Sequence, residues 1–237
     1  MSSIFDLFRK IETEKAPPAP VTHIVAGLGN YGREYEKTRH NAAWQFADSL
    51  PFGELLDWQS KFKGIYADAG IQSLAEILCN KGVIASKDGS PIRIPENAPA
   101  KIFFLKPETY MNNSGQSIIE LASFFKIKPE EILIVHDELE LPIGTVSLKW
   151  SGGLGGHNGL RSAKSVLNTA DFWRLRFGIS KPSGRDIADY VLSPFTADEQ
   201  IILSQVFPQA AQLLAKILFS TDPARLIPEW GKKKLLA

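Results

Sequence analysis

The sequence is poor in cysteine and methionine, and it lacks long uncharged hydrophobic runs. Cys79 is the single cysteine among 237 residues, so an intramolecular disulfide and a cysteine-only zinc site are both excluded, and a reducing compartment is expected. We find no apolar run of the length that a membrane span needs. The segment Met1 to Lys15 has no secretory hydrophobic region and contains acidic residues, which argues against a transit peptide. These absences predict a cytoplasmic protein without membrane contact.

Sequence motifs of several enzyme classes are also missing. The glycine-rich segments are not followed by Gly-Lys-Ser/Thr, which argues against a P-loop, and no G-x-S-x-G nucleophile motif occurs. The four histidines lie apart in the sequence without an H-E-x-x-H pair. The sequence therefore supports neither a serine or cysteine nucleophile nor a metal site, and we expect chemistry without a cofactor or a metal.

Charge is nearly balanced overall but is unevenly placed. The formal net charge is +1, yet the stretch from Lys149 to Arg185 holds seven basic residues and one acid, Asp171. A basic stretch in an otherwise mildly acidic chain is the footprint expected of a site for a polyanion. The simpler alternative is a set of solvated helix and strand faces, which is the commoner explanation for any single lysine or arginine.

The hydrophobic pattern predicts one α/β domain after an N-terminal arm. Residues 1–20 read as a short helical arm and a proline-rich linker, and residues 21–237 as the domain. Strand-like runs alternate with helical periods, which favours a three-layer sandwich with a mixed, largely parallel sheet and helices on both faces. Residues 80–99 look like an exposed excursion. The predicted strands are 21–26, 64–69, 74–79, 101–105, 132–136, 145–149 and 172–179, and the predicted helices are 41–50, 117–125, 160–167 and 197–219.

The segment Gly27 to Gly32 matches the dinucleotide-binding pattern G-x-G-x-x-G. In a nucleotide-binding fold the helix starts within the glycines, whereas here Arg33 to Arg39 is charged and helical periodicity begins only near Asn41. We therefore prefer a glycine-rich turn that needs positive φ angles.

Two polar residues lie where a predicted strand or helix ends near a common edge of the sheet. His40 is at the start of a helix, where the positive dipole end favours the neutral imidazole that a general base needs. Asp137 follows a buried strand, at the edge where ligands bind in open α/β sheets and where a carboxylate could orient a histidine. Taken alone, either residue could equally be an ordinary surface or cap residue.

Two further segments could bind an anion or an acyl group. Residues 151–160 contain five glycines around His157 and Asn158 just before a helix, so backbone amides and a helix N-terminus are free for an oxyanion. A plain flexible loop would explain the glycines but not His157 and Asn158. Asn112 supplies an uncharged donor and acceptor between a strand and a helix, and Ser114 is a plausible N-cap.

Six motifs in order resemble those of the bacterial-type peptidyl-tRNA hydrolases. They cover roughly residues 22–220 and are Gly27-Leu28-Gly29-Asn30-Tyr31-Gly32 with Tyr35, Thr38-Arg39-His40-Asn41, Tyr110-Met111-Asn112-Asn113-Ser114-Gly115, His136-Asp137-Glu138-Leu139, Gly155-Gly156-His157-Asn158-Gly159-Leu160, and Arg174-Leu175-Arg176-Phe177-Gly178-Ile179. The sequence departs from the family at Ser147, where many relatives keep a second lysine, at Ser180, which replaces a glycine, and at Tyr110, which replaces the commoner phenylalanine.

The resemblance implies cleavage of the ester that joins a peptide to tRNA, with peptidyl-tRNA as the partner. It assigns His40 as the general base on water and Asp137 as its hydrogen-bond partner. It places the substrate's carbonyl groups against asparagines and phosphate against basic residues. The implied substrate-binding residues are Asn30, Tyr35, Tyr110, Asn112 and Asn158, and the implied tRNA-phosphate residues are Lys149 and Arg174. A monomer is expected, and the alternative is a non-catalytic RNA-binding module derived from the same fold.

Overall fold

The computed structural model describes residues 22–84, 94–96, 98–184 and 186–236. Its strands form a single eight-stranded sheet in the order β2-β3-β4-β1-β5-β7-β6-β8. The predicted arm, residues 1–20, and half of the predicted excursion, residues 80–99, lie outside the described residues. The strand bounds are β1 Ile24–Gly27, β2 Gln59–Lys61, β3 Gly64–Gly70, β4 Lys101–Pro107, β5 Ile132–Glu138, β6 Thr145–Trp150, β7 Trp173–Gly178 and β8 Lys233–Lys234.

The sheet is parallel in its centre and antiparallel at both edges. Strands β4, β1, β5 and β7 run parallel, whereas β2, β3, β6 and β8 pair antiparallel with their neighbours. The central strands are rich in buried aliphatic residues, as expected of parallel strands that are covered on both faces. The predicted mixed, largely parallel sheet is confirmed.

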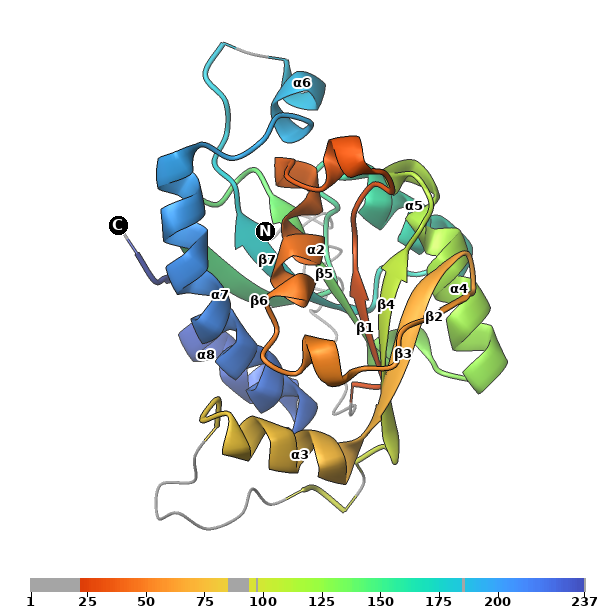
Figure 1. Ribbon diagram of the computed structural model, residues 1–237. Helices are drawn as coiled ribbons and strands as arrows, with labels where there is room; N and C mark the ends of the chain where they lie inside the picture. Colours follow the sequence, from red (N-terminus) through yellow and green to blue (C-terminus); the bar gives the residue numbers. More distant parts are fainter. Residues whose placement is uncertain (1–21, 85–93, 97, 185, 237) are drawn as a thin grey trace, which may run out of the picture.

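Helices cover both faces of the sheet (Figure 1). One face packs against α2, α3, α7 and α8, and the other packs against α4 and α5. The helix bounds are α2 Ala42–Asp48, α3 Ile71–Asn80, α4 Ser114–Phe125, α5 Asn158–Leu167, α6 Ile187–Val191, α7 Ala197–Leu218 and α8 Ile227–Trp230. Short 3-10 turns are η1 Arg33–Tyr35, η2 Arg39–Asn41, η3 Gly53–Leu55, η4 Met111–Asn113, η5 Pro129–Glu131 and η6 Pro223–Leu226. The three-layer sandwich expected from the sequence is therefore confirmed.

One predicted strand is wrong. Residues 74–79 lie inside α3, where Ile71, Leu74, Ala75 and Leu78 form one buried stripe. Their spacing of three and four residues is typical of a helix. The helical spacing becomes visible in the sequence only when Ile71 is included with residues 74–79.

The expectation that the chain lacks a run suited to a membrane span also needs correction. Among the described residues, α7 is long and apolar enough to pass that test. More than half of its apolar window is buried, with Leu213, Leu214 and Ile217 in the core against the sheet. This burial is that of a core helix in a globular fold.

The glycine-rich turn after β1 is explained by close packing. A Cβ on Gly29 would lie 2.6 Å from Nε1 of Trp44, which donates a hydrogen bond of 2.9 Å to the carbonyl oxygen of Gly27. Gly32 has a φ of 121°, a conformation that favours glycine. The predicted need for a positive φ thus holds at Gly32, whereas Gly29 is required by the close packing of α2 on the end of β1.

Candidate active site

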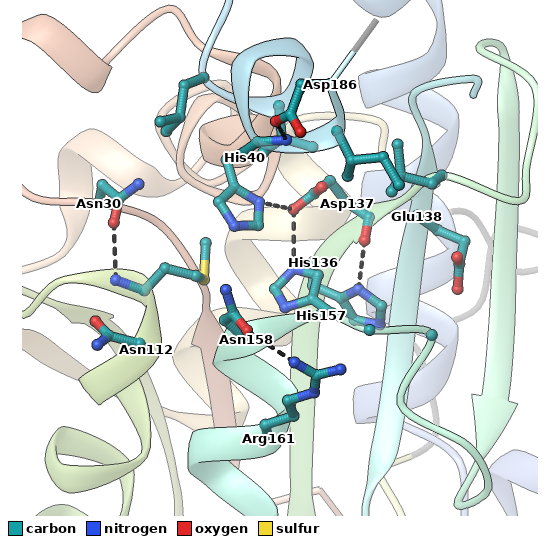
Figure 2. A pocket seen from close by; sticks show the side chains of 18 residues that line it. Asn30, His40, Asn112, His136, Asp137, Glu138, His157, Asn158, Arg161 and Asp186 are labelled. Atoms are coloured by element: carbon teal, nitrogen blue, oxygen red, sulfur yellow. Dashed lines mark hydrogen bonds and ion pairs between the residues drawn. The ribbon is translucent and has the colours of Figure 1, made fainter. Parts of the chain in front are cut away.

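A pocket of about 550 Å³ opens at the carboxyl ends of β1 and β5. Three segments surround it: the turn η2 before α2, the glycine-rich loop before α5, and the region of α6 (Figure 2). The pocket is lined by Asn30, His40, Asn112, Asp137, His157 and Asn158, among others. Five of these are sequence-predicted substrate or catalytic residues, Asn30, His40, Asn112, Asp137 and Asn158, and each comes from a different motif.

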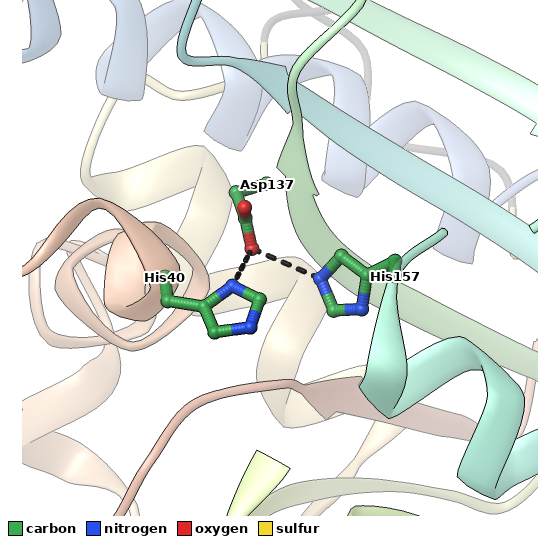
Figure 3. A group of neighbouring side chains, drawn as sticks. All are labelled: His40, Asp137 and His157. Atoms are coloured by element: carbon green, nitrogen blue, oxygen red, sulfur yellow. Dashed lines mark hydrogen bonds and ion pairs between the residues drawn. The ribbon is translucent and has the colours of Figure 1, made fainter. Parts of the chain in front are cut away.

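Asp137 connects two imidazole rings through one carboxylate oxygen (Figure 3). His40 Nδ1 lies 2.8 Å from Asp137 Oδ1, and His157 Nε2 lies 2.9 Å from the same oxygen. Asp137 is almost fully buried on β5. Burial alone would raise the pKa of Asp137, but the two imidazoles outweigh it and hold this pKa far below its ordinary value. The carboxylate is therefore ionised throughout the physiological range.

The hydrogen bonds fix the tautomer of His157. Its Nδ1 accepts from the backbone N–H groups of Gly159 and Leu160, at 3.2 and 3.4 Å, and so caps the N-terminus of α5. The proton of this ring must then be on Nε2, where it is donated to Asp137. The sequence pointed to His157 as a histidine directly before a helix in a glycine-rich run, but it assigned this residue no role in the site.

His40 has the opposite arrangement. Its Nδ1–H donates to Asp137, which leaves Nε2 as an acceptor on a ring that lines the pocket. Burial lowers the pKa of His40, but the charge and the hydrogen bond of Asp137 outweigh burial and raise this pKa above its ordinary value near 6.5. The expected shift toward the neutral form by the helix start is thus wrong, because the carboxylate is closer and fully charged.

The buried side chain of Arg39 positions His40. Arg39 donates to Ser193 Oγ at 2.8 Å and to Glu199 Oε2 at 2.5 Å, and it stacks over the ring of Tyr190 at 4.5 Å. These contacts attach η2 to the segment that leads into α7. The orientation of His40 therefore depends on contacts more than 150 residues away in the sequence.

His136 completes the cluster as a neutral ring. Its Nδ1 donates to the carbonyl oxygen of Asp137 at 2.6 Å, and its ring centroid lies 4.9 Å from that of His157. Burial holds the pKa of His136 well below its ordinary value. It therefore packs beneath the site without taking up a proton.

Asn30 presents its amide nitrogen to the pocket. Its side-chain Oδ1 accepts from the backbone N–H of Met111 at 2.7 Å, which directs Nδ2 away from that bond and toward the cavity (Figure 2). The backbone of Asn30 is held by Asn41, which accepts from its N–H at 2.8 Å and donates to its carbonyl oxygen at 2.9 Å. Asn30 is thus a fixed donor in a buried position.

The other two predicted asparagines lie at the exposed side of the pocket. Asn158 is the first residue of α5, and its Oδ1 accepts from Arg161 at 3.3 Å, which leaves its Nδ2 as a donor. Asn112 is exposed in η4. Tyr35 and Tyr110 do not line the pocket; Tyr35 is half-buried in η1, and Tyr110 is 63% exposed beside η4. A substrate role for either tyrosine would involve the rim or a larger substrate.

The two predicted phosphate-binding residues are neighbours on β6 and β7. Lys149 lies opposite Arg174 in the antiparallel register. Burial, then the charge of Arg176, lowers the pKa of Arg174 to about 10, and burial with Arg176 and Arg174 lowers the pKa of Lys149. Burial is the larger cause of both shifts, and the neighbouring guanidinium charges add to it.

Arg174 does not face solvent. It is only 1% exposed and donates to the carbonyl oxygens of Gly153 and Gly152, at 2.6 and 2.9 Å. In this conformation Arg174 does not offer its guanidinium to a phosphate, because the guanidinium already donates hydrogen bonds to the glycine-rich loop. Lys149 is half-buried and retains an accessible part.

His40, Asp137 and His157 form a cluster of potential metal ligands. Their ligand atoms all lie within 4.8 Å of one another, which is compatible with an ion. However, His157 Nε2 carries the proton that it donates to Asp137, since its other nitrogen accepts backbone hydrogen bonds. The hydrogen bonds at 2.8 and 2.9 Å account for the geometry of the cluster.

The fold and the site together define a hydrolase in which an α/β sheet presents a histidine–aspartate pair and fixed amide donors at one edge. A family model described as peptidyl-tRNA hydrolase matches residues 24–234. The chain belongs to the peptidyl-tRNA hydrolase family.

Individual relatives support this assignment over almost the whole chain. The peptidyl-tRNA hydrolase of Treponema pallidum is 41% identical over 218 residues, which cover 90% of this chain and 96% of the relative. That of Desulfitobacterium hafniense is 40% identical over 184 residues, which cover 77% and 85%. The solved Arg119Gln mutant of peptidyl-tRNA hydrolase from Acinetobacter baumannii has a TM-score of 0.73 at 29% identity and covers 91% of this chain and 97% of its own.

Proposed function

We propose that this protein hydrolyses the ester between the peptide and the 3′ ribose of peptidyl-tRNA, which recycles the tRNA. Family membership supports the activity, and the observation that carries the mechanism is the 2.8 Å hydrogen bond from His40 to the buried, ionised Asp137 at the pocket. The proposed setting is the cytoplasm, with a monomeric enzyme that needs neither a metal nor another cofactor.

His40 acts as the general base in this mechanism. Its Nε2 takes a proton from a water molecule as the water oxygen attacks the ester carbonyl, while Nδ1–H stays hydrogen-bonded to Asp137. The imidazolium is stabilised by the carboxylate, and its proton is then available to the leaving ribose oxygen. A positioned base contributes about 10²- to 10⁴-fold in rate.

The asparagines bind the charge that develops on the carbonyl oxygen. Asn30 offers the most preorganised donor, because its side chain and backbone are both held by hydrogen bonds. Asn112 and Asn158, at the exposed side, bind the ester and peptide carbonyls. One such donor contributes on the order of 10²- to 10³-fold in rate. Together with the general base, this contribution is enough for a water molecule to attack an ester directly, without a covalent intermediate.

Recognition of a peptide carbonyl gives the enzyme its selectivity. A site that hydrogen-bonds this carbonyl leaves polar groups unpaired when a free aminoacyl-tRNA binds, which disfavours cleavage. The intact His40, Asp137 and asparagines support a hydrolase over the non-catalytic RNA-binding alternative.

The test compares hydrolysis of N-acetylaminoacyl-tRNA with that of unblocked aminoacyl-tRNA. We expect release of the blocked amino acid and sparing of the free one, and we expect His40→Ala to lower kcat by about 10²-fold or more while the protein stays folded. His23→Ala is the matched control, because His23 precedes β1 at the opposite end of that strand. Equal cleavage of both esters would defeat the selectivity argument, and an active His40→Ala variant would defeat the mechanism.

A further inference from the structure

The sheet has a cationic region beside the pocket that lies outside the core under α4 and α5. The core under α4 and α5 is built from β1, β4 and β5, and among the described residues it takes no side chain from β6, β7 or β8. On this side β7 carries Arg174 and Arg176, and the adjacent strand β6 carries Ser147 and Lys149, which oppose them in register. Lys149 is the half-buried cation of this region, whereas the guanidinium of Arg174 is occupied by the glycine-rich loop.

The short strand β8, Lys233–Lys234, pairs with β6 at the edge of this sheet. Lys233 pairs with Val146 and Lys234 pairs with Thr145 in antiparallel register. Residues directly opposite in an antiparallel pair have side chains on the same face. Val146 belongs to the core on the α7 side, and Lys233 Nζ lies there, 2.5 Å from Glu229 Oε1 and 4.1 Å from the ring centroid of Trp230.

Lys234 must then be on the other face, with Thr145, Ser147 and Lys149, because successive residues of a strand alternate between faces. The chain before Lys233 lies against the same side, since Ser147 Oγ donates to the carbonyl oxygen of Gly231. Lys232 and Lys234 are both exposed, and within the described part of the chain neither forms an ion pair with an acid. In contrast, Lys233 is neutralised by Glu229.

The charges around these two lysines favour an anion. Arg176 is partly neutralised by Glu138 at 3.2 Å, and its Nη2 donates to Ser147 Oγ at 2.6 Å. Within the described residues, neither Lys149 nor Arg174 forms an ion pair, although the charge of Glu138 also acts on both. Adjacent strands are about 4.8 Å apart, so β8 continues the row of cations by about 10 Å from β7.

We propose that Lys232 and Lys234 extend the tRNA-binding face by contacting backbone phosphates of the substrate's duplex, farther from the ester than Lys149. This inference rests on the proposed function, and it assigns an RNA-binding role to the C-terminal strand. Charge complementarity and continuity with the face of β6 and β7 identify the occupant as a phosphate backbone.

The experiment measures binding of deacylated tRNA as a function of salt for single variants of the same strand. Lys234→Gln and Lys232→Gln should each weaken binding about fivefold to tenfold near 0.1 M salt and reduce the slope of log K against log salt by about 0.9. Lys233→Gln removes the same charge from the opposite face and should leave the slope unchanged. Lys234→Arg, which keeps the charge, should retain wild-type binding.

A second measurement separates this inference from the proposed function. With N-acetylaminoacyl-tRNA, Lys234→Gln should raise KM and leave kcat unchanged, whereas a substrate reduced to the terminal CCA trinucleotide should be cleaved as by the wild type. If the wild type cleaves N-acetylaminoacyl-tRNA and the Lys232 and Lys234 variants match the Lys233 variant in slope, the role of β8 is wrong. If the wild type cleaves neither substrate, the proposed function itself fails.

Discussion

At the scale of single residues, the site depends on how protons are distributed among three histidines around one aspartate. His157 is fixed as an Nε2–H tautomer by its cap on α5, and His136 is held neutral by burial. His40 combines a raised pKa with an acceptor nitrogen on a ring that lines the pocket. The environment therefore selects one of three chemically identical rings as the base.

This arrangement predicts the pH dependence of the reaction. The neutral form of His40 is the active one, so kcat/KM should fall as the pH drops through the His40 pKa, with a midpoint above 6.5. In Asp137→Asn the contribution that raises this pKa is lost and burial remains, so the midpoint should move to lower pH, and kcat should fall by on the order of 10²-fold or more. Measuring kcat/KM against pH with N-acetylaminoacyl-tRNA checks both.

The control is Asp68→Asn, which removes an aspartate from an exposed ion pair with Lys101 on the far part of the sheet. It should change neither midpoint nor rate. A midpoint that stays in place or rises in Asp137→Asn would show that the carboxylate does not control His40.

The sequence was sufficient to predict site residues that lie next to the end of their own strand or helix. Asn30 follows the end of β1, His40 precedes the start of α2, and Asp137 is the penultimate residue of β5. The role of His157 was not predicted, because it depends on two features together. His157 caps α5, and the N-terminus of α5 lies close to β5. Arg174 was assigned to phosphate because a sequence cannot show that loop carbonyls already occupy its guanidinium.

At the scale of elements, the site depends on close contact between α4 and α5. A Cβ on Gly115 would lie 2.4 Å from the carbonyl oxygen of Ser162, and the backbone N–H of Gly115 donates to Ser162 Oγ at 2.9 Å. Because α5 carries Asn158 and is capped by His157, its displacement would be transmitted to the pocket.

Gly115→Ala should therefore lower both stability and activity. Alanine favours a helix over glycine by about 1 kcal/mol, but the contact with backbone atoms cannot relax without separating the helices. We expect the free energy of unfolding to fall by about 1–3 kcal/mol, measured by denaturant titration, together with a lower kcat. Gly153→Ala is the control, since a Cβ there meets nothing within 4 Å. A stability equal to or above that of the wild type would contradict the packing argument.

The strength of each element's own pattern decided how well it could be predicted. The central strands β1, β4 and β5 are short buried runs bounded by turns, and the sequence places all three. The α3 stripe was mistaken for a strand because only its last part was considered. Strand β8 has no β pattern at all, since it consists of Lys233 and Lys234 and exists through pairing with β6.

At the scale of the whole molecule, the end of the chain completes the sheet and its core. Trp230 is 4% exposed in the core on the α7 side, and Lys233 and Lys216 lie over its ring at 4.1 and 5.7 Å from the centroid. Neither α8 nor β8 contributes to the described lining of the pocket. Stability and catalysis should therefore separate in this region.

Trp230→Ala tests that separation. Removing a buried tryptophan costs about 3–5 kcal/mol of unfolding free energy, which denaturant titration would measure. Below the unfolding transition, kcat at saturating N-acetylaminoacyl-tRNA should stay at the wild-type value, while KM should rise because β8 is no longer held by the ring. Trp230→Phe keeps an aromatic ring, and since Trp230 Nε1 has no hydrogen-bond partner among the described residues, this variant should lose less stability than the alanine variant. A fall in kcat of the folded alanine variant would mean that the core under α7 also shapes the catalytic pocket.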